Sequence, residues 1–381
     1  MSVFRSKQTD FYSLKEINKR KCPYNVIWSG RSNGKTFAVL DQALEDYFKS
    51  GGKNELAIIR RSDTDWKGQN SARNYYLALM EDAYGVNHIE KYSEGAFHGV
   101  VYWGGLYYLT VRDEEGREQR TDKIIARGFP LNKMEAQKGA RYPNVMTILF
   151  DEFITRGFYL QDEFILFCNV IKTIKGDRTD VTVYMCGNSV NRFNPYFQEM
   201  GLRRAATMEQ GTIDVYRYGD TPLRVACEYA EMAQRNGKHG DYYFAFDNPR
   251  LEMIKTGAWE LDIYPHCPVR YEKSDIAYTY FIEWAEDLYQ CEIVATGKEL
   301  FTFIHRKSTP LKERSSDVIF STTPSPKPNY RQNLLQPPDQ FGRRLASFYA
   351  SHTVFYQDNE VGEAIRNYLV FCKQQPIVKT A

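Results

Sequence analysis

The chain has 381 residues, enough for two domains with separate hydrophobic cores. A hydrophobic content of 43% with 26% charged residues is ordinary for a soluble globular protein. The net charge of +2 does not indicate a class of partner, because a basic patch can lie within a nearly neutral total.

The spacing of the cysteines and histidines argues against a disulfide-stabilised domain and against a zinc knuckle. The seven cysteines form no CxxC pair, and the six histidines are dispersed. This spacing favours reduced thiols over a disulfide framework or a zinc knuckle. No apolar stretch approaches the length of a membrane span, and the N-terminus has no signal-peptide core. We therefore expect a cytosolic protein with no membrane partner.

The first informative element follows a polar, basic segment at residues 1–24. An apolar run at 26–28 breaks into a glycine-containing loop that ends at the start of a helical pattern. Strand, glycine-rich turn and helix N-terminus in this order hold nucleotide phosphates through backbone N–H groups and the helix dipole. The loop residues are Ser29, Gly30, Arg31, Ser32, Asn33, Gly34, Lys35 and Thr36.

Two of these residues carry specific chemistry. Lys35 would reach the β- and γ-phosphates of ATP, and the Thr36 hydroxyl would ligate Mg²⁺. Ser29 stands where the first glycine of such a loop usually lies, so we interpret the loop as a variant. In the preceding segment, Phe11 or Tyr12 would stack on the adenine base, and ordinary packing of these rings is the alternative interpretation.

The pattern then predicts a mixed set of elements. The apolar run at 56–59 indicates a buried parallel strand that leads into Arg60 and Arg61. We expect a helix over 64–84. Alternating residues at 98–128, with turns at the paired glycines 104–105 and at 115–116, predict a β-hairpin between the main strands.

A second apolar strand, at 144–150, ends in Asp151 and Glu152. Beside a phosphate loop, an aspartate at this position holds the Mg²⁺ shell together with Thr36. The following glutamate accepts a proton from the attacking water or orients it. A solvated Asp-Glu pair at a strand end is the alternative interpretation, and the upstream phosphate loop favours the catalytic one.

A third strand, at 181–186, runs into Asn188. An amide at the end of the strand beside the acidic strand can sense the γ-phosphate, although Gly-Asn is also a common turn pair. Just before this strand, Arg178 is a candidate arginine finger acting on a neighbouring subunit's ATP. Arg156 is a rival for that role, and a solvated loop arginine is an alternative for both.

The second half of the chain has a different pattern. Residues 222–237 suit a helix, and 276–284, 288–294 and 300–305 predict three short strands. Residues 321–340 are rich in proline and are expected to be extended, and 361–372 suit an amphipathic helix. No three carboxylates show a spacing that promises a two-metal centre.

Taken together, the first half of the chain resembles the ATPase part of the large terminase family, and within it most closely the DNA encapsidation ATPases of phi29-type phages. The likeness lies in the loop 29–36 with its internal arginine, the strand 57–61 with its basic end, the acidic strand with its approach at 142–154, and the stretch 187–197.

This resemblance implies a RecA-like (ASCE) P-loop ATPase with a mainly parallel sheet, working with ATP and Mg²⁺. It implies a homo-oligomeric ring, pentameric in the phi29 type, that sits on the procapsid portal and drives double-stranded DNA inward in the host cytoplasm. A structural RNA is a further partner of that type. By position, Arg31 would sense phosphate, Arg178 would act in trans, and Asn188 would couple hydrolysis to motion.

We therefore expect an α/β architecture divided into four parts. These are a motor domain at 1–205, a linker subdomain at 206–255, a vestigial nuclease-like β-rich domain at 256–330, and a proline-rich segment with a C-terminal helix at 331–381. The resemblance implies that the smaller α+β domain is RNase H-like, and its carboxylate pattern predicts no nuclease activity. The alternatives are a terminase with an active nuclease and a nucleotide-binding adaptor without turnover.

Overall fold

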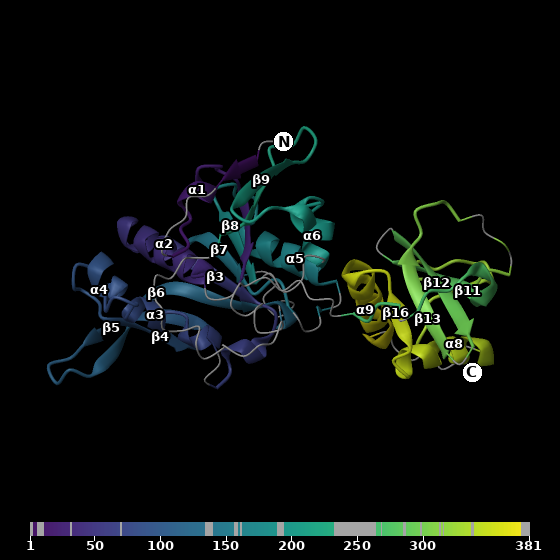
Figure 1. Cartoon of the computed structure of the whole chain (residues 1–381). Coiled ribbons are helices and arrows are strands. Elements are labelled where there is room, and N and C mark those ends of the chain that lie inside the picture. The colour runs from purple at the N-terminus through teal and green to yellow at the C-terminus, as the bar shows by residue number, and fades with distance from the viewer. Residues whose placement is uncertain are drawn as a thin grey trace. The chain divides into compact units, whose positions relative to one another are not determined.

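The computed structural model of the chain forms two compact units, Met1–Glu260 and Leu261–Ala381 (Figure 1). The structure describes residues 3–5, 11–30, 33–68, 71–133, 140–155, 159–160, 162–188, 194–231, 264–267, 269–284, 287–297, 299–311, 314, 316–336 and 339–374.

The first unit alternates strands and helices along most of its length. Its elements are β1 (Val3–Arg5), α1 (Lys15–Asn18), β2 (Tyr24–Ser29), α2 (Lys35–Lys49), β3 (Glu55–Arg60), η1 (Asp63–Trp66), η2 (Ser71–Asn74), α3 (Leu77–Met80), α4 (His88–Tyr92), β4 (Gly99–Trp103), β5 (Leu106–Arg112), β6 (Glu118–Pro130), β7 (Val145–Asp151), α5 (Glu163–Lys175), β8 (Thr182–Asn188), α6 (Pro195–Glu199), η4 (Ala205–Thr207), β9 (Thr212–Arg217) and β10 (Arg224–Tyr229).

These strands build one ten-stranded sheet in the order β1-β9-β10-β2-β8-β7-β3-β6-β5-β4. The six central strands, β10 to β6, are parallel. Antiparallel strands extend the sheet on both sides. The hairpin predicted at 98–128 is present as β4 and β5 at an edge of the sheet, and the rest of this range belongs to β6, which pairs in parallel with β3. The strand β8 lies between β2 and the acidic strand β7, as its predicted role requires.

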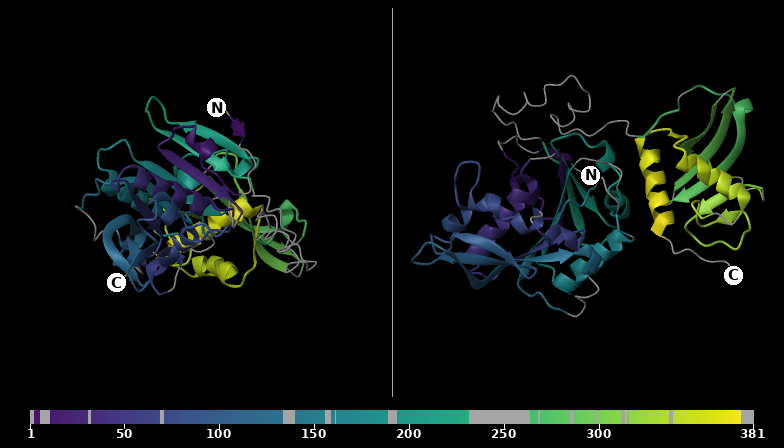
Figure 2. Two further views of the ribbon diagram at one scale, coloured as in Figure 1. Left: turned by 90° about the vertical axis from the view of Figure 1, so that its left-hand side faces the viewer. Right: turned by 90° about the horizontal axis from the view of Figure 1, so that it is seen from below.

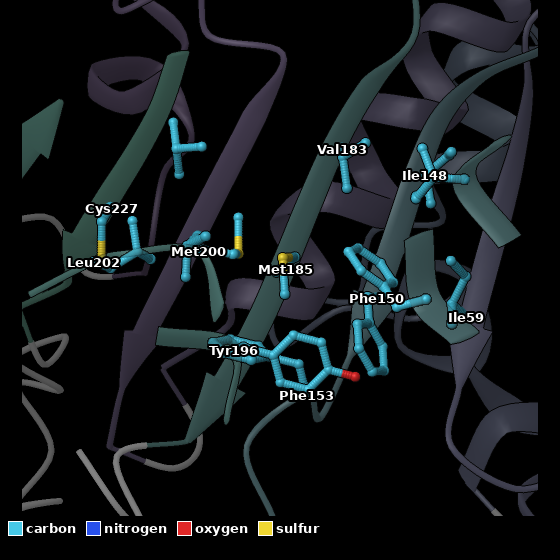
Figure 3. Packing of buried hydrophobic residues seen from close by; sticks show 14 of the residues in the cluster. Ile59, Ile148, Phe150, Phe153, Val183, Met185, Tyr196, Met200, Leu202 and Cys227 are labelled. Atoms are coloured by element: carbon cyan, nitrogen blue, oxygen red, sulfur yellow. The ribbon is translucent and has the colours of Figure 1, made fainter. Parts of the chain in front are cut away.

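Hydrophobic layers cover both faces of the sheet, because each central strand alternates its side chains between them. On one face, Phe150 and Met185 pack against α5 and α6, with Tyr196 among them (Figure 3). On the other face, Leu149 packs against α2 through Val39 and other apolar residues of that helix. The continuous apolar runs of the sequence therefore correspond to strands buried on both sides.

Three sequence predictions for this unit were wrong. Residues 64–84 form the short turns η1, η2 and α3 in place of one helix. Residues 224–229, predicted as helical, form β10, which pairs in parallel with the phosphate-loop strand β2. The expected boundary at 205 with a linker at 206–255 does not match this pairing, because β9 and β10 complete the same sheet.

The second unit is a six-stranded sheet covered by two helices. Its elements are η6 (Lys273–Asp275), β11 (Ile276–Trp284), β12 (Asp287–Thr296), β13 (Glu299–Arg306), β14 (Ile319–Ser321), β15 (Tyr330–Arg331), α8 (Gln340–Ala350), β16 (Val354–Tyr356) and α9 (Asn359–Gln374). The strand order is β15-β14-β11-β12-β13-β16. Figure 2 shows the two C-terminal helices (yellow) beside the strands of this sheet (green).

The three predicted strands of this unit and its last helix are confirmed. The separate segment predicted at 331–381 is not, because Leu345 of α8 and Ile365 of α9 share one core with Tyr280 of β11. The strand β16 also pairs with β13. Among the described residues, no helix combines the length and the apolar character needed to cross a membrane.

Candidate nucleotide site

The loop between β2 and α2 has a backbone shape that depends on Gly34. This residue caps α2 with φ +85°, a left-handed conformation that an L side chain adopts only with strain. The turn brings Lys35 and Thr36 to the start of α2, where the helix N–H groups are free to bind an anion. Arg31 and Ser32 lie outside the described residues.

The ammonium group of Lys35 is held inside this loop. It donates to the Ser29 hydroxyl at 2.7 Å and to the Gly30 carbonyl at 3.0 Å. Burial lowers the pKa of Lys35 to about 8, against the opposing effects of Cys186 and Asp151. Ser29 is small enough for the turn, and its hydroxyl also accepts the hydrogen bond from Lys35 that a phosphate oxygen would accept in a bound nucleotide. Asn33 donates to the same hydroxyl at 3.2 Å.

Asp151 ends β7 directly opposite the start of α2. The Thr36 hydroxyl donates to Asp151 Oδ1 at 2.7 Å, although 115 positions separate the two residues in the chain. A hydroxyl and a carboxylate oxygen are hard ligands of the kind that Mg²⁺ prefers. The donor set therefore fits the metal predicted for this position, and the convergence expected of these two residues is present.

Glu152 turns away from the strand direction. Its φ of +55° is uncommon for a residue with a side chain, and its side chain is 54% exposed. Asp151 is by contrast buried. The two neighbouring acids thus have different surroundings, one facing α2 and one reaching into solvent beside it.

Arg60, at the end of β3, joins both acids. Its guanidinium lies 3.3 Å from Asp151 Oδ2, 2.8 Å from Glu152 Oε2 and 3.3 Å from Asp65 Oδ2. Burial opposes its charge, but Tyr75 and the three carboxylates together raise the pKa of Arg60. We did not assign a role to Arg60 from sequence. The sequence did hold a signal for this ion pair, because the strand at 56–60 ends in a basic residue and the strand at 145–151 ends in an acidic one.

Several predicted site residues line a common cleft of about 260 Å³. It is lined by Asn33, Gly34, Lys35, Thr36, Phe37, Asp151, Glu152, Cys186, Gly187 and Asn188. Asn188 reaches it because β8 lies between β2 and β7, so that Asn188 pairs with Ser29 in register. Residues predicted from three separate stretches therefore meet in one cavity, and their individual roles stay predictions.

A second polar network lies beside this cleft. Arg61 binds Glu163 in a bidentate pair at 2.7 and 2.8 Å, and it donates to the Phe153 carbonyl at 2.9 Å. The Tyr196 hydroxyl donates to the same Glu163 at 2.7 Å. Phe153, the residue after the acidic pair, is thereby linked through Arg61 and Glu163 to Tyr196 of α6, the helix that follows β8. This contact physically links the stretches 142–154 and 187–197.

The structure gives Arg178 a different environment from the one expected of an arginine finger. Its guanidinium donates to the carbonyls of Tyr142, Pro143, Val145, Ile174 and Lys175, at 2.8–3.4 Å. These carbonyls lie where β7 begins and α5 ends, at the opposite end of the strands from Asp151. Arg178 therefore closes a turn, and the hydrogen bonds account for it without a neighbouring subunit. Its rival, Arg156, lies outside the described residues.

The N-terminal segment lies over the phosphate loop. The Tyr12 backbone N–H donates to the Asn33 carbonyl at 3.1 Å, and its hydroxyl donates to Glu228 at 2.6 Å. Phe11 and Tyr12 both line a cavity of about 950 Å³ beside α2, with Phe37 and Tyr84. Of the two rings predicted to stack on a base, Phe11 is the more exposed.

Glu228 provides a prediction about stability and pH. It is 1% exposed, and burial raises its pKa to about 7, with the hydrogen bond from Tyr12 as a smaller opposing effect. The folded chain therefore keeps a proton that the unfolded chain loses near pH 4.5. This stabilisation is complete at low pH and is lost as the pH rises through 7, by about 2 kcal/mol between pH 5 and 8.

Urea unfolding of Glu228→Gln at pH 5 and pH 8 checks this expectation. The variant should lack this part of the decline in unfolding free energy, because the amide does not titrate. The exposed Glu209 supplies the matched control, and Glu209→Gln should decline as the wild type does. Equal declines in the two variants would contradict the assignment.

The described residues of the second unit show no comparable cluster. Within the residues that the structure describes, no group of three or more His, Cys, Asp or Glu side chains is placed to hold a metal. The Glu292 carboxylate of β12 accepts hydrogen bonds from the Tyr271 hydroxyl and the Gln290 amide, both at 2.6 Å. Asp262 and Glu286, two further carboxylates of this half of the chain, lie outside the described residues.

Comparison with known proteins relates part of this chain to phage DNA packaging. A family model described as Podovirus DNA encapsidation protein (Gp16) matches residues 113–208, which include β7 and β8. The DNA packaging proteins of Bacillus phages PZA and phi29 are each 35% identical over 190 residues, 49% of this chain and 49% of theirs. The chain thus matches about half the length of these curated relatives.

The fold extends this similarity to nearly the whole chain. A chain of the phi-28 gp11 DNA packaging motor superposes with a TM-score of 0.59, covering 96% of this chain and 99% of that one. Its sequence identity is 16%, so the match shows a common fold and leaves activity open.

Proposed function

We propose that this chain is the ATPase of a phage DNA-packaging motor, which binds ATP with Mg²⁺ and couples its hydrolysis to the translocation of double-stranded DNA. The convergence of Lys35, Thr36, Asp151, Glu152 and Asn188 in one cleft carries this proposal. The local similarity to phage DNA packaging proteins supports DNA as the translocated polymer.

In the proposed reaction, Lys35 and the N–H groups of the loop bind the phosphates. Thr36 and Asp151 would hold the metal, which when bound would neutralise charge on the phosphate oxygens. Glu152 orients the attacking water and takes its proton, while Asn188 contacts the γ-phosphate from the adjacent strand. Glu152 has to exchange its ion pair with Arg60 for water before it can act as a base.

The adenine base would occupy the cavity beside α2. Phe11 offers a ring face there, and Asp41 and Gln42 offer polar groups for the edge of the base. The cavity also borders Gly34, so a nucleotide with its phosphates in the loop can extend its base into it. Replacing Phe11 by alanine would test whether the base stacks on this ring.

The second unit is proposed to be an RNase H-like domain without nuclease activity. In support, β11, β12 and β13 form an antiparallel meander, and β14 and β15 add to its first strand in parallel. A ring of subunits, pentameric by resemblance, at the procapsid portal in the host cytoplasm is part of the same proposal, with a structural RNA as a further partner. Arg156 remains a candidate for acting on a neighbour's nucleotide, and Arg31 for sensing phosphate.

DNA-stimulated ATPase activity of the full chain tests this function. We expect hydrolysis that rises with added duplex DNA and loses the stimulation at high salt, because sequence-independent phosphate contacts weaken as salt rises. Tight ATP binding without turnover would instead identify a nucleotide-binding adaptor. Metal-dependent cutting of plasmid DNA in the same samples would identify an active nuclease. Co-sedimentation with empty procapsids tests the portal as partner.

A further inference from the structure

We propose that Tyr75 is a positioning residue for the metal-holding carboxylate of Asp151. The inference rests on the nucleotide site proposed above and adds to it a residue that lies in neither the phosphate loop nor the acidic strand. The Tyr75 hydroxyl donates to Asp151 Oδ2 at 2.6 Å, while the Thr36 hydroxyl donates to Oδ1 at 2.7 Å. The two carboxylate oxygens are therefore held from opposite sides by two neutral donors.

Tyr75 makes the shortest contact at Oδ2. Arg60 also reaches this oxygen, but at 3.3 Å, and its guanidinium is shared with Asp65 and Glu152. A neutral hydroxyl fixes the orientation of a carboxylate without cancelling the charge that attracts a metal. An ordinary phenol is protonated near neutral pH, so Tyr75 is the donor in its hydrogen bond to Oδ2.

The segment that carries Tyr75 is anchored by packing on the neighbouring strands. The Trp66 indole donates to the Tyr107 hydroxyl at 3.0 Å, and that hydroxyl donates to the Ala72 carbonyl. Trp66 lies against Gly128 of β6, where an added Cβ would approach its ring to 2.9 Å. The absence of a side chain at Gly128 thus lets this segment lie close to the sheet and presents Tyr75 to the end of β7.

The consequence concerns which oxygen of Asp151 is available. With Oδ2 occupied by Tyr75, Oδ1 faces Thr36, on the side where the metal is proposed to bind. Without the phenol, Arg60 is left as the partner of Oδ2 among the described residues, and the carboxylate is free to rotate toward the guanidinium and away from Thr36. Partners behind a metal ligand typically change metal affinity 10- to 100-fold when removed.

Tyr75→Phe in the full chain tests this role, with Tyr76→Phe as the matched control. Tyr76 is the adjacent buried tyrosine, and it packs against the ring of Tyr107 with centroids 5.4 Å apart. We expect Tyr75→Phe to raise the Mg²⁺ concentration for half-maximal ATP hydrolysis about tenfold. Tyr76→Phe should leave it within about twofold of the wild type. Binding of Mn²⁺ to the protein–ATP complex, followed by electron paramagnetic resonance, should weaken by the same factor in Tyr75→Phe alone.

Two further readouts separate positioning from a general structural effect. ATP affinity in EDTA should be unchanged in Tyr75→Phe, and excess Mg²⁺ should restore its maximal rate. Equal Mg²⁺ requirements in the two variants, or a rate loss that excess Mg²⁺ does not restore, would overturn the role of Tyr75. A wild-type protein without Mg²⁺-dependent ATP binding would instead remove the proposed function itself, and the inference with it.

Discussion

Glu152→Gln is expected to reduce DNA-stimulated ATP hydrolysis on the order of 10²- to 10⁴-fold while ATP binding persists. The amide keeps the size and the polar contacts of the side chain but cannot accept a proton from water. Binding should survive because Lys35 and Thr36, which would hold the phosphates and the metal, lie on α2 and keep their places. Steady-state hydrolysis and equilibrium binding of a fluorescent ATP analogue measure the two quantities.

The matched control for this change is an exposed glutamate outside the cleft. Glu115 pairs with Arg117 in the turn after β5, and its side chain is 65% exposed. Glu115→Gln should hydrolyse ATP at the wild-type rate. Equal rates in Glu152→Gln and the wild type would remove Glu152 from the mechanism.

Arg60→Ala is expected to lower the free energy of unfolding by about 3 kcal/mol, the largest change in stability that we predict. The arginine side chain is 8% exposed and faces three carboxylates, so its removal leaves the buried charge of Asp151 without its cation. Breaking a buried ion pair costs more than the pair contributes, because one charge remains desolvated. Urea unfolding at neutral pH gives the value.

An exposed arginine tests whether this loss depends on burial. Arg117 forms ion pairs with Asp113 and Glu115 and is 69% exposed. Exposed pairs contribute roughly 0–1 kcal/mol, so Arg117→Ala should change stability little. If the two alanine variants lose similar amounts, then Arg60 does not act as the buried counter-ion of the acids.

The local order of the sequence was sufficient to predict much of the site. The phosphate loop and the acidic strand each consist of an apolar run that ends in a few residues with defined chemistry. Such runs indicate a parallel sheet, and the carboxyl ends of parallel strands lie at one edge. Lys35, Thr36, Asp151 and Asn188 could therefore be predicted to meet, and the structure brings them together in one cleft.

The contributions of Arg60, Tyr75 and Arg178 depended on which strands are neighbours. Arg60 meets Asp151 because β3 pairs with β7, and Arg178 reaches its carbonyls because β7 begins beside the end of α5. The place of β10 also depended on the order of the strands, because it pairs with β2 although about 200 positions separate them along the chain.

The sequence by itself thus determined the phosphate loop, the acidic pair and the parallel strands that carry them, because each depends on residues adjacent in the chain. The tertiary structure alone decided the contacts of Arg60 and Tyr75 with Asp151, the turn-closing contacts of Arg178 and the extension of the first sheet through β10. Hydrogen bonds and ion pairs at strand ends are set by the order of strands in the sheet, and this order is fixed only when the whole core packs.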